Sequence, residues 1–104
     1  MKIAIAAEKE KEDGIICPTA GRAPFYLIYE DGKLVNTIKN PFAVGGGGAG
    51  FGVAQMLCKE GTNLVISGKF GGNMTSALEE KGIEYKEMNG SVKDALRTLD
   101  KDLE

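Results

Sequence analysis

The sequence predicts one α/β domain of three layers (α/β/α), in which helices cover both faces of a five-stranded mixed sheet. In the second half of the chain, short apolar runs alternate with amphipathic helical patterns, as βαβ units require. In the first half, an Asp-Gly pair separates two β-prone runs and indicates a hairpin. The chain has 104 residues, enough for one hydrophobic core, so we expect residues 1–104 to form a single domain.

The first half of the chain contains three predicted strands. Residues 3–7 are continuously apolar, which favours a buried strand. A charged run without an apolar stripe follows over residues 8–13, and we expect a solvated loop from there to the second strand. Residues 25–29 and 34–38 are rich in aromatic and branched side chains, and Asp31-Gly32 lies between them as the hairpin turn.

The second half contains three predicted helices, over residues 51–59, over residues 74–81 and from Ser91 onward, separated by strands over residues 64–66 and 83–88. The expected helix signals are Asn73 and Ser91 as N-caps, Asp94 at the capping-box position, and Gly61 and Gly82 as C-terminal glycines. The apolar positions of the first helix are Val53, Ala54, Leu57 and Cys58. This spacing predicts that Cys58 packs in the core.

The connections predict the order of the strands. The hairpin makes the second and third strands antiparallel, and right-handed crossovers through the helices make the third, fourth and fifth strands parallel. With the first strand between the second and the fourth, the order is 3-2-1-4-5 and strand 2 is antiparallel. Cys17, Arg22 and residues 45–52 and 68–72 then meet at one edge of the sheet. Ligands of open α/β sheets bind at such an edge.

A glycine-rich run precedes the first predicted helix. Apart from Phe51, residues 45–52 are all Gly or Ala. Two interpretations stay open: a flexible loop, or a backbone that closely approaches another part of the fold or a ligand held on exposed N–H groups. The run matches G-x-G-x-x-G, but it follows the third strand and no acidic residue lies about 20 positions later, so dinucleotide binding is not favoured.

Residues suited to catalysis are scarce. The chain has no histidine, which removes the commonest general base and any His-containing nucleophile pair or metal site. No pair of carboxylates is predicted at the glycine edge. Cys17 lies in a loop five residues before Arg22, where a cation could lower the thiol pKa and make it a metal ligand or nucleophile. An ordinary, partly buried loop cysteine is the alternative.

Charge and hydropathy exclude two classes of partner. The formal net charge is −2 and the pI is near 5.2, which argues against a general nucleic-acid or anionic-membrane binder. No apolar run is long enough to span a bilayer, and the chain enters its first strand without a signal peptide. We therefore expect a cytoplasmic protein with no membrane or nucleic-acid partner.

Four segments together carry a family resemblance. They are MKIAIA, GRAPFYLIYEDGKLV, the Asn-Pro with the glycine-rich segment and helix that follow it, and LVISGKFGGNMTSALEEKGIEY. In this order, over nearly the whole chain, they resemble the dinitrogenase iron–molybdenum cofactor biosynthesis family (nitrogenase accessory factor-like). The resemblance implies a ribonuclease H-like motif. It also implies a protein that binds or carries iron–molybdenum precursors and related metal–sulfur clusters.

The resemblance further implies where a cluster binds. Gly21, Arg22 and Ala23 match the family's Gly-Arg-Ala, and Gly45 to Gly50 match its histidine- and glycine-rich loop. Gly68 and Gly71 match its loop after the fourth strand. Positions where the family often has histidine hold Thr19, Ala43 and Val44. Cys17 is then the soft metal ligand at this edge. The expected cofactor-binding residues are Cys17, Gly21, Arg22, Gly45, Gly46, Gly47, Gly48 and Gly50.

We therefore expect a non-catalytic carrier of an iron–molybdenum or related metal–sulfur cluster that works with cluster donor and acceptor proteins. One cysteine cannot hold a cluster strongly, so a second chain in a homodimer or an external thiol would complete the coordination. Arg22 and the helix start near Phe51 could offset the negative charge. Lys69 could add to this, and an ordinary exposed surface lysine is the alternative for that residue. Two alternatives stay open: an enzyme that acts on a small anion or nucleotide through the glycine loops, and a regulatory module that binds a protein partner.

Overall fold

The computed structural model describes residues 1–11, 13–43 and 49–102. Its elements are β1 (Lys2–Ala7), the short 3₁₀ helix η1 (Ala20–Arg22), β2 (Phe25–Glu30), β3 (Lys33–Lys39), α1 (Ala49–Lys59), β4 (Leu64–Ser67), α2 (Gly72–Glu80), β5 (Glu84–Glu87) and α3 (Val92–Asp102). Each predicted strand and helix corresponds to one of these elements. The sequence did not predict η1, which lies inside the long loop after β1.

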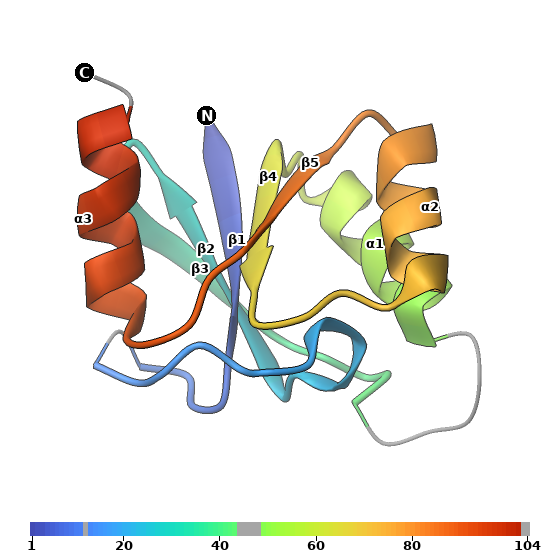
Figure 1. The fold of residues 1–104 in the computed structure, drawn as a ribbon, viewed down its shortest axis with the longest axis horizontal. Coiled ribbons are helices and arrows are strands. Elements are labelled where there is room, and N and C mark those ends of the chain that lie inside the picture. The colour runs from blue at the N-terminus through green and yellow to red at the C-terminus, as the bar shows by residue number, and fades with distance from the viewer. Residues whose placement is uncertain (12, 44–48, 103–104) are drawn as a thin grey trace.

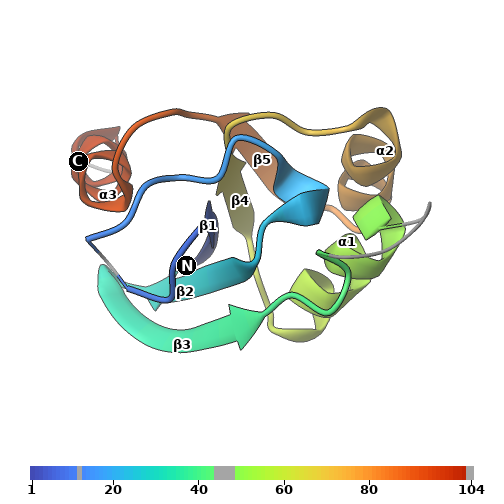
Figure 2. The same ribbon diagram turned by 90° about the horizontal axis from the view of Figure 1, so that it is seen from below.

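The predicted sheet is confirmed. Its strand order is β3-β2-β1-β4-β5, β2 is antiparallel to both of its neighbours, and β4 is parallel to β1 and β5. Helices α1 and α2 lie on one face of the sheet and α3 lies on the other, which makes three layers (Figure 1). Seen from below, the segment after β1 crosses the lower edge of the sheet beside the connection from β4 to α2 (Figure 2).

Strict alternation along the strands builds a core on each face of the sheet. Ala4, Ala6 and Val65 pack in the cluster beneath α1 and α2. Ile3, Ile5 and their neighbours pack in the cluster beneath α3. Because successive strand residues point to opposite faces, a strand covered on both faces is apolar throughout. This is why β1 reads as a continuous apolar run.

The hairpin between β2 and β3 forms as the Asp-Gly pair predicts. Asp31 has a φ of 52° and Gly32 a φ of 81°, so both turn residues are left-handed, as a type I′ turn requires. The pairing then shifts between Ile28 and Tyr29, whose partners are Asn36 and Leu34, so Val35 forms a bulge in β3. The bulge bends the edge strand just beyond the turn.

The helix ends agree only partly with the sequence signals. Ser91 caps α3, because its Oγ accepts a hydrogen bond from the Asp94 N–H at 3.0 Å. The assignment of Asn73 as the cap of α2 is wrong: the helix already includes Gly72, and Gly71 is the N-cap without a side-chain hydrogen bond. Helix α1 begins at Ala49, two residues before its predicted start.

The expected burial of Cys58 is also wrong. Cys58 is exposed, although Val53, Ala54 and Leu57 are buried as predicted. Residues adjacent in a helix are rotated by about 100° around its axis, so Cys58 lies outside the stripe that contacts the sheet. Helical spacing alone places Cys58 beside Ala54, but the width of the contact with the sheet decides which side chains are covered.

Candidate functional site

The loop after β1 and the end of β4 meet at the lower edge of the sheet, as predicted. The Cys17 N–H donates to the Ala6 carbonyl at 2.8 Å, which ties the loop to β1. The Cys17 carbonyl accepts from the Gly68 N–H at 2.9 Å and from the Ser67 hydroxyl at 3.1 Å. The backbone of Cys17 therefore joins two loops that are fifty residues apart in the sequence. We call residues 17–23 and 67–70 the lower edge.

Gly68 is required at this junction by close backbone approach. A Cβ at Gly68 would lie 2.5 Å from the Pro18 Cα and 2.8 Å from the Pro18 carbonyl oxygen. Both loops are hydrogen-bonded in place, so neither can move away cheaply. The contact is between two parts of the fold, which explains the glycine without a ligand.

Segment 20–23 is held by buried polar groups. The Ala20 N–H donates to the Lys69 carbonyl at 2.9 Å, and the Tyr26 hydroxyl donates to the Ala20 carbonyl. The buried Asn40 side chain donates from Nδ2 to the carbonyls of Gly21 and Ala23, at 3.2 and 2.8 Å. These bonds fix η1, whose last residue is the exposed Arg22, and they tie it to the backbone of Lys69, which is also exposed.

The sequence reasoning did not identify Asn40 or Tyr26 as part of this edge. Asn40 reads as the start of an Asn-Pro turn, and Tyr26 reads as one of several aromatic strand residues. Both side chains are buried, at 4% and 0% exposure, and each donates to a carbonyl of the loop. A polar turn residue directly after an edge strand is the only signal that the sequence offers for Asn40.

Cys17 lies at the predicted edge, but its thiol is not activated. The residue is 6% exposed, and its Sγ donates to the Thr19 carbonyl at 3.4 Å. Burial raises the pKa of the Cys17 thiol, the charge of Glu8 raises it further, and a backbone hydrogen bond at Thr19 offsets part of this. The expectation that a nearby cation lowers this pKa is therefore wrong. Desolvation is the largest cause of the shift, so the buried thiol keeps its proton.

The glycine run is only partly described. Gly45, Gly46, Gly47 and Gly48 lie outside the described residues. Within α1, a Cβ at Gly50 would lie 2.9 Å from the Met74 backbone nitrogen in α2, and one at Gly52 would lie 2.5 Å from the Phe42 ring. These two glycines therefore permit close packing, of α1 on α2 and of Phe42 on α1.

The described residues do not gather metal ligands into one group. Across residues 1–11, 13–43 and 49–102, no group of three or more Cys, Asp or Glu side chains is placed to hold a metal ion. What the lower edge does provide is one buried thiol, two exposed cations and a rigid backbone. It is suited to an anion that brings most of its own coordination.

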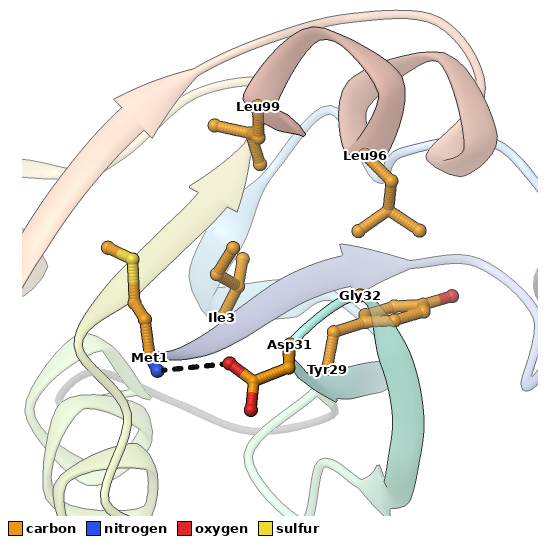
Figure 3. Close-up of a pocket in the computed structure, with 7 residues that line it drawn as sticks. All are labelled: Met1, Ile3, Tyr29, Asp31, Gly32, Leu96 and Leu99. Atoms are coloured by element: carbon orange, nitrogen blue, oxygen red, sulfur yellow. Dashed lines mark ion pairs between the residues drawn. The ribbon is translucent and has the colours of Figure 1, made fainter. Parts of the chain in front are cut away.

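A cavity lies at the opposite end of the sheet. It has a volume of about 70 Å³ and is lined by Met1, Ile3, Tyr29, Asp31, Gly32, Leu96 and Leu99. Figure 3 shows Ile3, Leu96 and Leu99 between the sheet and α3, with the Met1 ammonium 3.8 Å from the Asp31 carboxylate. Such a volume holds a few water molecules at most. We read it as imperfect packing beneath α3.

No helix of the described part of the chain has the length and hydropathy needed to span a bilayer. None of the curated proteins compared with the chain matches it. Among solved structures, the apo form of the orange protein from Desulfovibrio gigas is 30% identical and superposes with a TM-score of 0.88, over 96% of this chain and 88% of that one. A putative NifB protein from Thermotoga, at 22% identity, superposes with a TM-score of 0.82, over 96% of this chain and 87% of that one.

The likeness to the putative NifB protein, at 22% identity, supports the fold alone. The sequence likeness to the orange protein extends over almost the whole chain. The family described as dinitrogenase iron–molybdenum cofactor matches residues 1–102. The fold, the order of the loops at the lower edge and these matches agree with the resemblance stated above. The chain belongs to the dinitrogenase iron–molybdenum cofactor family.

Proposed function

We propose that this protein is a non-catalytic carrier that binds an anionic metal–sulfur cluster as cargo at the lower edge. The observation that carries the proposal is the meeting of the Gly21-Arg22 turn with the loop after β4, which places the exposed Arg22 and Lys69 beside the buried Cys17. Membership of the family and the likeness to the orange protein support a role in cluster handling.

Charge complementarity is the first part of the argument. Clusters of metal, sulfide and thiolate are anionic, and a rigid guanidinium donates several hydrogen bonds to such an acceptor surface. Arg22 is the last residue of η1, and hydrogen bonds from Tyr26 and Asn40 hold this turn in place. Because the backbone of this turn is already fixed, binding of an anion by Arg22 does not have to order the loop as well.

The role of Cys17 is the second part. We propose Cys17 as the single protein thiolate of the complex. To act so, it must lose its proton and exchange the Thr19 carbonyl for a metal, and the free energy of metal–sulfur bonding supplies both. The cargo's own sulfides or a thiol from another molecule complete the coordination. This limited hold suits a carrier that must release its cargo to an acceptor protein.

Compartment and partners follow from the same proposal. Cys17 and Cys58 are both free cysteines, in keeping with a reducing compartment such as the cytoplasm. The expected partners are proteins that supply or accept the cluster. Gly45, Gly46, Gly47 and Gly48, which lie outside the described residues, and Gly50 stay in the proposed site.

Reconstitution without oxygen tests the proposal. The purified chain is incubated with iron, molybdate and sulfide and then desalted, and visible absorption and metal content are measured. We expect coloured, metal-loaded protein. Arg22→Gln should weaken binding roughly tenfold, about 1.4 kcal/mol, while Arg97→Gln, at an exposed arginine on α3, should leave it unchanged.

Variants of the two thiols distinguish the role of the Cys17 thiolate from that of the Arg22 charge. Cys17→Ser should reduce metal retention, while Cys58→Ser should not. Retention that survives Cys17→Ser but falls with Arg22→Gln would show an anion site without a protein thiolate. A wild-type chain that stays colourless and metal-free would overturn the carrier function.

A further inference from the structure

Strand β5 forms an open edge of the sheet. It is the last strand in the order and comprises Glu84–Glu87. In Figure 1 this orange strand crosses the front of the molecule between α3 and α2, and no other element is drawn before it. An open edge is a template for pairing with another strand unless charge, bulges or a covering element prevent it.

The direction of the β5 backbone groups follows from its pairing with β4. The N–H groups of Glu84 and Met88 donate to the carbonyls of Asn63 and Ser67, at 3.0 and 2.8 Å. In a parallel ladder, alternate residues direct both N–H and C=O to the same neighbour. Residues 84, 86 and 88 therefore face β4, and the backbone groups of Tyr85 and Glu87 face outward.

One register of a second copy satisfies these outward groups. If a two-fold axis passes beside Tyr85, the two β5 strands run antiparallel and Tyr85 lies opposite Tyr85 of the partner subunit. Because the backbone N–H and C=O of Tyr85 face outward, this is a hydrogen-bonded pair that exchanges two N–H···O bonds. The Glu87 N–H then lies opposite the carbonyl of Ile83 of the partner subunit, and two-fold symmetry repeats that contact.

The charges of β5 are complementary in this same register. Glu84 lies opposite Lys86 of the partner subunit, and Lys86 lies opposite Glu84 of the partner subunit. Within one chain, Glu84 and Lys86 lie beside Leu64 and Ile66 of β4, which belong to the cluster beneath α3. Both charged pairs therefore lie on the face of the sheet that α3 covers. They occupy the non-hydrogen-bonded positions, where opposing side chains are closest. Lys86 already has an interaction within its own chain, and an ammonium has three donors, so it can keep that interaction.

Both faces beside β5 are hollowed. On the α3 side, a hollow of about 280 Å³ has Ile3, Leu64 and Leu99 among its lining residues. On the α2 side, a hollow of about 450 Å³ is lined by Glu79, Gly82, Ile83, Glu84 and Tyr85. In the register described above, the aliphatic stem of Lys86 of the partner subunit would extend over the first hollow. The Tyr85 ring, whose centroid is 5.2 Å from that of the Phe70 ring, would lie beside its symmetry mate on the other face.

The other edge of the sheet is built against such pairing. A two-fold axis at Asn36, in the middle of β3, would place Lys33 opposite Lys39 of the partner subunit at both ends. The bulge at Val35 also interrupts the regular spacing of the backbone groups. Lysines and a bulge are common protections of an edge strand. Strand β5 has neither a bulge nor a like-charge pair in the register described here.

From these observations we propose that two copies of this chain associate through β5, as one continuous ten-stranded sheet with the two-fold axis at Tyr85. The lower edges of the two copies then lie at opposite ends of the joined strands. Each keeps its own Cys17 and Arg22, so this association does not depend on cluster binding. With only four residues per strand, the interface is of the small, transient class.

Charge reversal at β5 tests the register. Sedimentation velocity from about 10 μM to about 1 mM, a range suited to a transient interface, should show a monomer–dimer equilibrium for the wild type. Glu84→Lys and Lys86→Glu should each weaken it tenfold or more, because both symmetric pairs become like-charged. The double variant E84K/K86E should dimerise like the wild type, and so should Lys33→Glu on β3.

Mixing gives the sharpest result. A chain with Glu84→Lys and a chain with Lys86→Glu should each be monomeric alone but form a mixed dimer, since every cross-strand pair is then opposite in charge. In wild type, exchange of the Tyr85 and Glu87 amides should slow as the concentration rises. A wild type that is monomeric throughout the range, or single variants that dimerise as well as the wild type with unchanged circular dichroism, would overturn the proposal.

Discussion

Gly68→Ala should destabilise the protein strongly, because the added methyl group has no space. Its Cβ would lie 2.5 Å from the Pro18 Cα, 2.8 Å from the Pro18 oxygen and 3.0 Å from the Pro18 carbonyl carbon. Carbon atoms pack at about 3.5 to 4.0 Å, so the two backbones must separate by roughly 1 Å. The obstacle is backbone, which cannot rotate away as the end of a flexible side chain can.

The loss of unfolding free energy in Gly68→Ala can be worked out from the contacts that this separation breaks. Insertion of a methyl group into a packed region costs about 1–3 kcal/mol. The Gly68 N–H and the Ser67 hydroxyl both bond the Cys17 carbonyl, at 2.9 and 3.1 Å, and each bond contributes about 1 kcal/mol. Partial loss of these bonds brings the total to about 2–4 kcal/mol, or a fall in Tm of roughly 10–25 °C for a domain of this size.

Gly72→Ala, in the same connection, is the matched control. Apart from the neighbouring residues and the backbone of its own helix, a Cβ there has no heavy atom within 4 Å, and Gly72 is the first residue of α2. Alanine favours the helix over glycine, so this variant should be neutral or up to about 1 kcal/mol more stable. Thermal and urea unfolding followed by circular dichroism measure both. A Gly68→Ala variant within 0.5 kcal/mol of the wild type, or equal losses at both positions, would refute the reasoning.

Three further predictions concern the thiols, the lower edge and a helix cap. In native protein at neutral pH, iodoacetamide should modify the exposed Cys58 at least tenfold faster than Cys17, whose buried thiol has a raised pKa; equal rates by peptide mass spectrometry would contradict the burial of Cys17. Asn40→Ala should cost about 2–4 kcal/mol in urea unfolding, because two loop carbonyls and the Phe42 N–H lose their partner; a loss under 1 kcal/mol would show that water replaces the amide. Ser91→Ala should cost about 1 kcal/mol and Ser91→Asp should restore stability, since either oxygen caps α3; equal stability of Ser91→Ala and the wild type would remove the cap from the account.

Local chemistry determined the fold. Asp31-Gly32 sets the hairpin because few other residue pairs adopt two successive left-handed conformations at low cost. Ser91 caps α3 through an atom three residues away. The continuous apolar runs of β1 and β4 are typical of central strands, and with β1 between β2 and β4 the right-handed crossovers give the observed strand order. Each of these signals acts within a few residues, so it can be recognised in the sequence alone.

The site depended on contacts between segments that are distant in the sequence. The sequence placed Cys17 and Gly68 at one edge, but only the fold shows that Gly68 makes room for Pro18 and that burial keeps the Cys17 thiol protonated. The burial of Asn40 and the exposure of Cys58 were likewise decided by which surfaces cover them. Burial, desolvation and close backbone approach are properties of pairs of segments. The sequence of either segment alone does not contain them, so only the tertiary structure could decide these features.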